Sequence, residues 1–397
     1  MTPPSDAPER VSRALDTLQI ELPSWGFSDT GTRFGKFLQP AAAATIDEKL
    51  GDAAEVHRLT GCCPTVAVHV LWDFPGGIAS VDGVLQLAAR AGVRIGSINP
   101  NLFEDQQYKH GSLANPDAEV RRAALAHLLD CVEIATRTGS RDISVWLADG
   151  SNYPGTAHIR RRRAWIEEAL VEAHRRLARG QRLLVEYKPF EPAFYHTDVA
   201  DWGMALLLAR AAGPQARVLV DTGHHYQAQN IEQIVAWLLD EGMLGGFHFN
   251  DRRYADDDLT LGSIDPYQTF RIFHEIALFT AEHGAPADLA WMIDQSHNLK
   301  GKIEAMIQTV AIAQELAAKA ALVDSQQLLE YQSRLALVEA EETLRRAFLT
   351  DVLPWLRDWR RRHGLPEDPL VAFRESGYLE RITRERSGRR KAASSYA

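Results

Sequence analysis

The segments LLVEYK (residues 183–188) and VLVDTGHH (residues 218–225) each join an apolar run to acidic or imidazole side chains. FHFND (247–251) and MIDQSHN (292–298) repeat that pattern further along the chain. A short apolar run of this kind is typical of a strand buried in a sheet. Because a parallel barrel gathers the C-terminal ends of its strands at one face, the pattern predicts that these side chains meet there.

Strand-like and helix-like segments alternate along most of the chain. Eight candidate strands lie at residues 20–27, 65–71, 93–98, 142–147, 183–188, 217–221, 245–250 and 289–294. Segments with helical spacing of apolar residues lie between them, for example at 80–91, 118–137, 160–179, 199–212 and 231–241. This alternation predicts an α/β protein built of parallel βαβ units. Eight repeats favour a closed (β/α)₈ TIM barrel over a doubly wound sheet.

The length of 397 residues leaves room for one large barrel and an appended piece. We expect an N-terminal segment over 1–19, the barrel over 20–302, a C-terminal helical extension over 303–383 and a disordered tail over 384–397. The extension is predicted from Ala-, Leu- and Glu-rich segments at 311–321 and 325–347 and a further helical segment at 353–363. Loops are predicted at 31–37 and 251–264, and the second follows the seventh strand, where a barrel carries functional residues.

The composition excludes several classes of protein. A net charge of −9 argues against a nucleic-acid surface. Three cysteines form neither a disulfide framework nor a CxxC zinc motif. The N-terminus, MTPPSDAPERV, lacks the basic start and apolar core of a signal peptide, and no uncharged apolar run reaches the roughly 18 residues of a membrane span. We therefore expect a cytoplasmic chain without nucleic-acid or membrane partners.

Four consecutive predicted strands carry a metal-ligand residue type near their ends: Glu186, Asp221, His248 and Asp294. Taken alone, His248 would more often be a core histidine. Burying so many acids together without a cation would be unfavourable, however. Mixed carboxylate and imidazole ligands suit a divalent ion such as Mn²⁺ or Mg²⁺. The set therefore predicts a metal site.

Further polar residues flank these strand ends. Lys188 lies two residues after Glu186, so a strand turns both to one face, although the two would also fit a structural ion pair. His224 follows Asp221 after a glycine that permits a tight turn, so both side chains can reach one cavity. In the acidic loop, Asp256 and Asp258 could ligate a second ion or could simply be solvated.

Aromatic residues stand near the ends of two other strands. His69, Trp72 and Asp73 lie at the end of the second strand, and Trp146 ends the fourth. Aromatic rings beside polar groups suit a sugar, which offers C–H faces to stack and hydroxyls to bond. The alternative is that both tryptophans belong to the core.

The motifs EYKPFEP, VDTGHH, FHFNDRRYADDDL and MIDQSHN together resemble the bacterial L-rhamnose isomerase family, in its broad-specificity branch, and more distantly xylose isomerase. The likeness covers the chain from about Trp25 to beyond Asn298. It implies a (β/α)₈ barrel with a C-terminal helical extension, assembled as a homotetramer. It also implies that L-rhamnose and L-rhamnulose, and related aldoses such as L-lyxose, L-mannose and D-allose, are interconverted by a metal-mediated 1,2-hydride shift.

The resemblance implies two divalent ions per subunit, with Mn²⁺ expected and Co²⁺, Mg²⁺ or Zn²⁺ as alternatives. By position, one ion is held by Glu186, Asp221, His248 and Asp294, and the second by Asp221, His224, Asp256 and Asp258. The catalytic residues are Lys188, His69 and Asp294. Lys188 would hydrogen-bond the sugar oxygen that gains charge, and His69 would assist ring opening, with Asp73 as an orienting partner. The substrate-binding residues are Trp72, Trp146, Ser296 and Phe34, the last reaching into a neighbouring subunit's site.

Three other functions remain open at this point. A ketose 3-epimerase on the same barrel needs two opposed acid/base groups, usually glutamates, around one ion. A hydrolase or nuclease on a related barrel is a further option, against which the net charge argues where the substrate is a nucleic acid. A metal-stabilised sugar-binding protein without turnover would leave the role of Lys188 unexplained.

Overall fold

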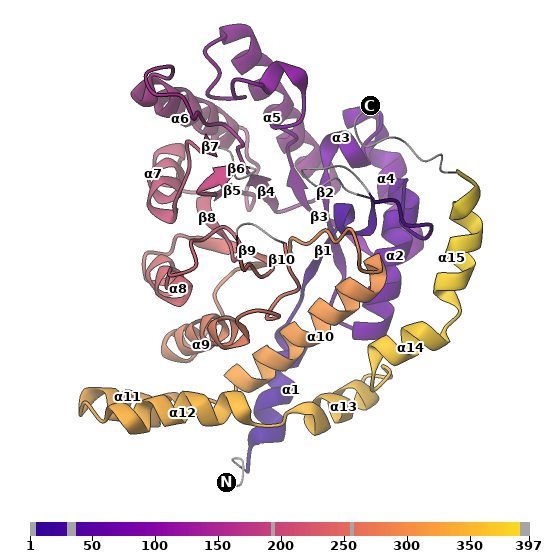
Figure 1. The fold of residues 1–397 in the computed structure, drawn as a ribbon, viewed down its shortest axis with the longest axis vertical. Helices are drawn as coiled ribbons and strands as arrows, with labels where there is room; N and C mark the ends of the chain where they lie inside the picture. The colour runs from indigo at the N-terminus through magenta and orange to yellow at the C-terminus, as the bar shows by residue number, and fades with distance from the viewer. Residues whose placement is uncertain (1–4, 30–36, 192–194, 255–257, 390–397) are drawn as a thin grey trace.

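The computed structural model describes residues 5–29, 37–191, 195–254 and 258–389. Its parallel strands close into a barrel in the order β1-β10-β9-β8-β5-β4-β3-β2 (Figure 1). The barrel strands are β1 (Glu21–Pro23), β2 (Thr65–His69), β3 (Arg94–Asn99), β4 (Asp142–Val145), β5 (Arg182–Glu186), β8 (Ala216–Asp221), β9 (Leu244–Phe249) and β10 (Ala290–Ile293). Each overlaps one of the eight predicted strands, so the predicted TIM barrel is confirmed.

Two short segments depart from the strand predictions. The first predicted strand, over 20–27, is a strand only at Glu21–Pro23 and continues as a 3₁₀ turn, Ser24–Phe27. After β5, the chain forms a small antiparallel ribbon of β6 (Phe190–Glu191) and β7 (Tyr195–His196) outside the barrel.

Eight helices form the outer layer of the barrel: α2 (Ile46–Thr60), α4 (Val81–Ala91), α5 (Ala118–Thr138), α6 (Ile159–Arg175), α7 (Trp202–Ala212), α8 (Ile231–Asp240), α9 (Pro266–His283) and α10 (Lys302–Ala320). The helical spacing identified α4 to α8. Helices α2 and α9 were not predicted from the spacing of apolar residues, although both have clear sequence signals at their N-termini. Thr45 and Glu48 form a capping box at the start of α2, and Asp265 caps α9 directly before Pro266.

Helix α10 packs between α9 and α2 and completes the outer layer, so we place the end of the barrel at Ala320 rather than at residue 302. The extension then consists of α11 (Ser325–Ser333), α12 (Leu337–Leu349), α13 (Leu353–Arg362), α14 (Pro369–Glu375) and α15 (Tyr378–Arg386). The single helix expected over 325–347 is broken at Leu335, whose φ is +53°. Helix α15 reaches into the segment expected to be disordered from residue 384.

The extension runs along the outside of α10 and α2, and α1 (Ala7–Thr17) packs between α10 and α13 (Figure 1). A short helix, α3 (Val70–Asp73), directly follows β2. Among the described residues no single helix has the length and apolar character to span a membrane. Only taken together do α10 and α11, which are separated by a bend of 59°, reach that length and apolar composition.

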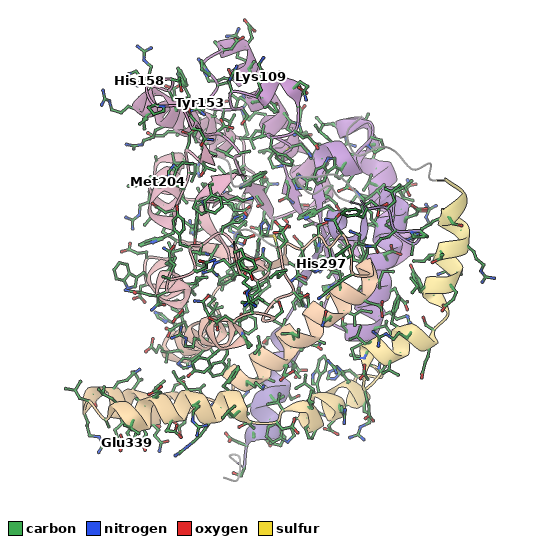
Figure 2. The ribbon with its side chains drawn as sticks, in the orientation of Figure 1. Lys109, Tyr153, His158, Met204, His297 and Glu339 are labelled. Carbon is green, nitrogen blue, oxygen red and sulfur yellow. The ribbon has the colours of Figure 1, made fainter. Side chains whose placement is uncertain are left out.

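The loops after β3 and β4 are tied together above one end of the barrel. Asp149 accepts hydrogen bonds from the backbone N–H groups of Ser112 (2.8 Å) and Ala114 (2.7 Å). Figure 2 shows Lys109 and Tyr153, which these loops carry, at the same end of the molecule. Because Asp149 is buried, these bonds hold both loops in one arrangement.

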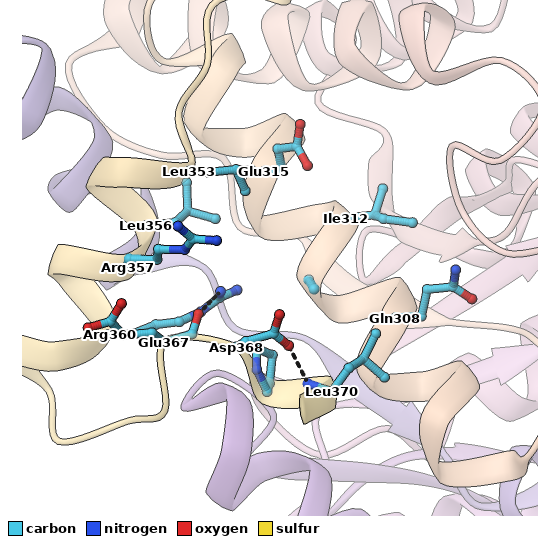
Figure 3. Close-up of a pocket in the computed structure, with 12 residues that line it drawn as sticks. Gln308, Ile312, Glu315, Leu353, Leu356, Arg357, Arg360, Glu367, Asp368 and Leu370 are labelled. Atoms are coloured by element: carbon cyan, nitrogen blue, oxygen red, sulfur yellow. Dashed lines mark hydrogen bonds between the residues drawn. The ribbon is translucent and has the colours of Figure 1, made fainter. Parts of the chain in front are cut away.

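A pocket of about 260 Å³ lies between α10, α13 and α14 (Figure 3). Its apolar lining includes Ile312, Leu356 and Leu370, and Glu315 and Arg357 lie at its edge. All of its lining residues come from α10 and the extension, so this pocket is separate from the strand ends.

Helix α15 is anchored to α2 through one buried carboxylate. Arg386 donates two hydrogen bonds to Asp52, at 2.8 and 2.9 Å, and the Tyr378 hydroxyl donates a third at 3.0 Å. Burial raises the pKa of Asp52 to about 6, although Arg386 and Tyr378 oppose that shift. The ion pair joins residues more than three hundred positions apart in the sequence.

We expect Asp52→Ala to lower the free energy of unfolding by about 3 kcal/mol, because it leaves the guanidinium of Arg386 buried without its partner. Chemical denaturation measures the change. Glu385→Ala is the control, since it removes an exposed ion pair with Arg381 from the same helix and is expected to change stability by less than about 0.5 kcal/mol. Equal losses in the two variants would contradict the anchoring role of Asp52.

Candidate metal centre

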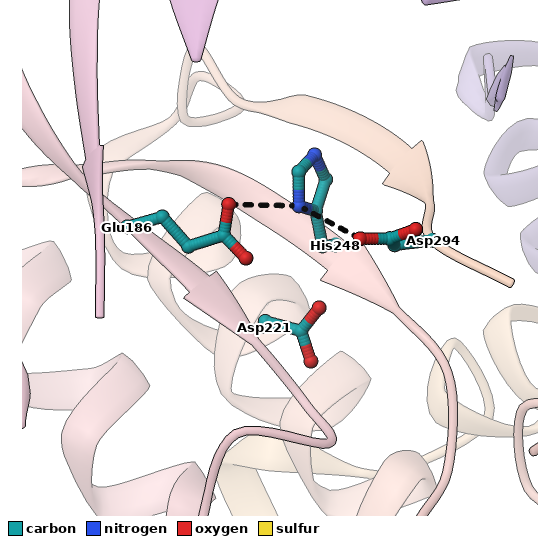
Figure 4. Close-up of side chains that lie close together, drawn as sticks. All are labelled: Glu186, Asp221, His248 and Asp294. Carbon is teal, nitrogen blue, oxygen red and sulfur yellow. Dashed lines mark ion pairs between the residues drawn. The ribbon is translucent and has the colours of Figure 1, made fainter. Parts of the chain in front are cut away.

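Four potential ligands meet at the C-terminal ends of neighbouring strands (Figure 4). Glu186 ends β5, Asp221 ends β8, His248 lies within β9, and Asp294 directly follows β10. Because β5, β8, β9 and β10 are adjacent in the barrel, their ends converge, and Asp221 pairs directly with His248 in the strand register. One ligand atom from each residue lies within 4.8 Å of the others.

His248 lies among the three carboxylates without satisfying its ring nitrogens. Nδ1 lies 3.2 Å from Glu186 Oε2 and 3.6 Å from Asp294 Oδ2. Neither ring nitrogen has a hydrogen-bond partner among the described residues, although the side chain is buried. Buried ring nitrogens without a hydrogen-bond partner are typical of a histidine that ligates a metal ion.

The electrostatics of the cluster also fit a cation. Burial would lower the pKa of His248, but the surrounding carboxylates outweigh that and raise it to about 9. Burial would raise the pKa of Glu186, but the imidazoles of His248 and His224 outweigh that and hold it below its usual value. Burial, with Glu186 nearby, raises the pKa of Asp294. Two buried carboxylates, the partly buried carboxylate of Asp294 and one buried imidazole are a donor set that suits a divalent cation.

Two neighbouring side chains fix the orientation of the carboxylates. Asn250 Nδ2 lies 3.1 and 3.2 Å from the two oxygens of Asp221 and also donates to the main-chain carbonyl of Asp294. Trp25 Nε1 donates to Asp294 Oδ1 at 2.8 Å. Neither Asn250 nor Trp25 was predicted from the sequence to be a functional residue. Asn250 could have been found, because it lies two residues after His248 and shares its face, but nothing in the sequence links Trp25 to Asp294.

The glycine after Asp221 is needed for close packing. A Cβ atom at Gly223 would come within 2.5 Å of Asn250 Oδ1, and the backbone there does not have a positive φ. The N–H of Gly223 donates to Asp221 Oδ1 at 2.7 Å. The expected tight turn is present, but glycine serves it through close approach and not through a left-handed conformation.

His224 is also buried and lies beside Asp221. Its Nδ1 lies 3.0 Å from the main-chain carbonyl of Tyr187 and 3.2 Å from Glu186 Oε1. Because a carbonyl only accepts, Nδ1 donates this hydrogen bond, and Nε2 lies 3.8 Å from Asp221 Oδ2. A histidine that ligates a metal commonly donates its other ring N–H in this way.

The remaining predicted ligands and contacts are placed only in part. Asp258 is partly buried, with φ at +48°, and lies in the loop between β9 and α9. Ser296 lies two residues beyond Asp294 and is partly buried. Asp256 and Phe34 lie outside the described residues.

Aromatic side chains form a continuous wall beside the ligand cluster, which we call the aromatic wall: Trp25, His69, Trp72, Phe103 and Trp146. Ring centres lie 4.2 Å apart for His69 and Trp72 and 4.9 Å apart for Phe103 and Trp146. Phe103, which the sequence analysis did not identify, also packs against Trp72 and joins the two tryptophans. The buried Lys188 places its Nζ 4.9 Å from the ring centre of Trp146.

Asp73 does not hydrogen-bond the His69 ring, in contrast to the expected orienting role. Its carboxylate accepts from the Ser24 hydroxyl, from Lys49 Nζ at 2.6 Å and from the backbone N–H of His69 at 2.9 Å. Nδ1 of His69 has no hydrogen-bond partner among the described residues. Burial, with help from His248 and Lys49, lowers the pKa of His69 to about 3, so its ring is neutral at physiological pH.

Comparisons with known proteins agree with this geometry. The model of a family described as xylose isomerase-like TIM barrel matches residues 73–296. A Rhizobium meliloti protein named "Probable sugar isomerase" is 39% identical over 383 residues, covering 95% of this chain and 88% of that protein. A protein of Mesorhizobium japonicum with the same description is 38% identical over the same shares. The solved structure of an L-ribulose 3-epimerase aligns with a TM-score of 0.56 and 13% identity over 79% of this chain and 98% of that one, a likeness of fold alone.

Ion binding at the cluster is expected to release about one proton at pH 7. With its pKa raised to about 9, His248 is protonated when no ion is bound, and an imidazole must be neutral to ligate a metal. For the same reason the affinity is expected to increase with pH up to about 9. Calorimetric titration of Mn²⁺ in buffers of different ionisation enthalpy measures the number of protons released.

His248→Asn is the matched control for this measurement, because it leaves the carboxylates in place but removes the titrating ring. Proton release is expected to fall towards zero in this variant, with weaker ion binding. An unchanged proton release would show that His248 is not the group displaced by the ion.

Proposed function

Because the chain belongs to the xylose isomerase-like TIM barrel family, we propose that it is a metal-dependent aldose–ketose isomerase. The observation that carries the proposal is the largely buried cluster of Glu186, Asp221, His248 and Asp294 at the strand ends, where a barrel enzyme carries its active site. Its substrates, in this proposal, are L-rhamnose and L-rhamnulose, with L-lyxose, L-mannose and D-allose as related aldoses. The motifs that resemble the L-rhamnose isomerase family support this choice.

We assign the ligands to two ions. The first is held by the four residues of the cluster, and the second by Asp221, His224, Asp258 and Asp256. The position of His224 Nε2 beside Asp221 supports the shared use of that carboxylate. When bound, divalent ions supply Lewis acidity towards the oxygens of the sugar.

The other side chains bind and orient the sugar in this proposal. Lys188 donates a hydrogen bond to the oxygen that gains charge, and its burial strengthens that interaction. The neutral ring of His69 accepts or returns a proton as the sugar ring opens. Trp72 and Trp146 of the aromatic wall stack on C–H faces, and Ser296 and Phe34 make further contacts. Asp294 orients the substrate from its place in the cluster.

The finer properties rest on the family resemblance. We propose Mn²⁺ as the bound ion, a homotetramer as the assembly and the cytoplasm as the location. The donor set would also accept Co²⁺, Mg²⁺ or Zn²⁺.

A ketose 3-epimerase is the second candidate. The four described residues of the cluster could together ligate one ion, which is the number that such an enzyme needs. It contains a single glutamate, however, whereas an epimerase usually opposes two across the substrate. The two reactions differ in how hydrogen moves, since epimerisation exchanges a carbon-bound proton and a hydride shift does not.

The test of the proposed reaction is proton NMR of Mn²⁺-loaded protein with L-rhamnose in D₂O. We expect L-rhamnulose without deuterium at C1. Deuterium at C1 would retain the isomerase but replace the hydride shift by proton transfer. No conversion across a panel of aldoses, with deuterium entering C3 of a ketose, would instead identify an epimerase. Sugar binding without any conversion would contradict both enzymes and identify a binding protein.

Asp221→Asn is expected to weaken both ions and to lower turnover by at least about a hundredfold, because it removes the carboxylate that we assign to both sites. Asp258→Asn is the comparison variant and is expected to weaken one ion only. Metal content after dialysis and turnover of L-rhamnose measure the two effects. Normal metal content and turnover in Asp221→Asn would contradict the bridging role.

A further inference from the structure

Arg252 is a buried cation that the proposed reaction does not use. It follows β9 and is 8% exposed. Its guanidinium donates to three main-chain carbonyls: to His225 through Nε at 2.6 Å, to Thr222 through Nη1 at 3.0 Å and to Tyr226 through Nη2 at 2.9 Å. All three acceptors belong to residues 222–226, which we call the β8 loop.

Burial of this guanidinium is unfavourable unless its donors are well satisfied. Among the described residues no carboxylate lies within ion-pair distance of Arg252, so the three carbonyls are its hydrogen-bonding partners. A planar guanidinium holds several acceptors at fixed relative positions, which an ammonium group does not do. The arrangement therefore fixes the conformation of the β8 loop.

The β8 loop carries His224, and Arg252 bonds to the backbone of the loop before and after His224. The carbonyls of Thr222 and His225 flank His224 in the sequence. The His225 ring is held in turn by the Tyr187 hydroxyl at 2.6 Å, and the Tyr187 carbonyl accepts from His224 Nδ1. The direction of His224 Nε2 thus depends on the loop conformation.

The backbone of the other cluster ligands is held by the barrel strands and not by this loop. Glu186 and His248 lie within strands, and Asp294 directly follows one, so the hydrogen bonds of the barrel hold their backbone. Asp221 is held by its own strand and by Asn250, which directly follows β9, and it also accepts from the N–H of Gly223 in the β8 loop. A change in the β8 loop would therefore displace His224 most, and it would reach the first cluster only through the hydrogen bond between Gly223 and Asp221.

We propose that Arg252 is a positioning residue for the second ion: it clamps the β8 loop so that His224 Nε2 is presented beside Asp221. This inference rests on the proposed two-ion function. It predicts a selective effect, because the second ion loses a correctly placed ligand while the first keeps all four of its own.

The test is a Mn²⁺ titration of metal-free protein, with free Mn²⁺ followed by electron paramagnetic resonance. In Arg252→Ala the affinity for the second ion is expected to fall by about 10- to 100-fold, as is typical when a residue that orients a metal ligand is removed. The affinity for the first ion is expected to stay within about twofold of the wild type. Arg252→Lys keeps the charge but cannot hold three carbonyls, so it is expected to show the same selective loss.

Arg253→Ala is the matched control, since Arg253 directly follows Arg252 after β9 and is exposed. It is expected to bind both ions as the wild type does. Thermal unfolding of each metal-free variant establishes that it is folded, and Arg252→Lys carries the test if Arg252→Ala does not fold.

Three results would overturn the assignment. Wild-type affinity for the second ion in Arg252→Ala would show that the clamp is not needed. Full rescue by Arg252→Lys would assign the effect to charge alone. Equal weakening of both ions would make Arg252 a general structural residue. If the wild-type chain itself binds a single ion, the two-ion function fails first, and that result is distinct from a change confined to the variants.

Discussion

Three carboxylates converge on one imidazole in the interior of the barrel mouth, and much of the surrounding structure serves to hold them there. Glu186, Asp221 and Asp294 have ligand atoms within 4.8 Å of one another and of His248. Such a concentration of negative charge in a buried place is unfavourable unless a cation or fixed donors compensate it. Asn250 donates to the carboxylate of Asp221, and Trp25 donates to Asp294 Oδ1, so both carboxylates are held in place at the shared centre.

The ligands differ in how their positions are secured. Those on or directly after β5, β8, β9 and β10 are fixed by the hydrogen bonds that close the barrel. His224 lies on a loop and has no such support, so side chains from other segments hold it. Tyr187 bonds to its ring and to its neighbour, and Arg252 bonds to the carbonyls around it. His224 is therefore held by side-chain and carbonyl contacts, whereas the strand residues are held by the barrel itself.

The aromatic side of the barrel mouth is assembled from segments that follow different strands. The aromatic wall joins Trp72 after β2, Phe103 after β3 and Trp146 after β4. The buried ion pair of Lys49 and Asp73 supports the aromatic wall, because Asp73 also accepts a hydrogen bond from the backbone N–H of His69. The buried Lys188 lies against this wall, with its Nζ 4.9 Å from the ring centre of Trp146, and burial strengthens its electrostatic interactions.

The sequence by itself determined the barrel and the four side chains that meet at its strand ends. Strand and helix periods are local, and a barrel places every strand end at the same face, so apolar runs ending in acids already predict a shared site. Only the tertiary structure decided that Asn250 and Trp25 orient the carboxylates, that Asp73 binds the backbone of His69, and that α10 completes the barrel. Trp25 and Asp294 are separated by 269 positions, and a contact of that range leaves no periodic trace in the chain, because it depends on the closure of the whole barrel.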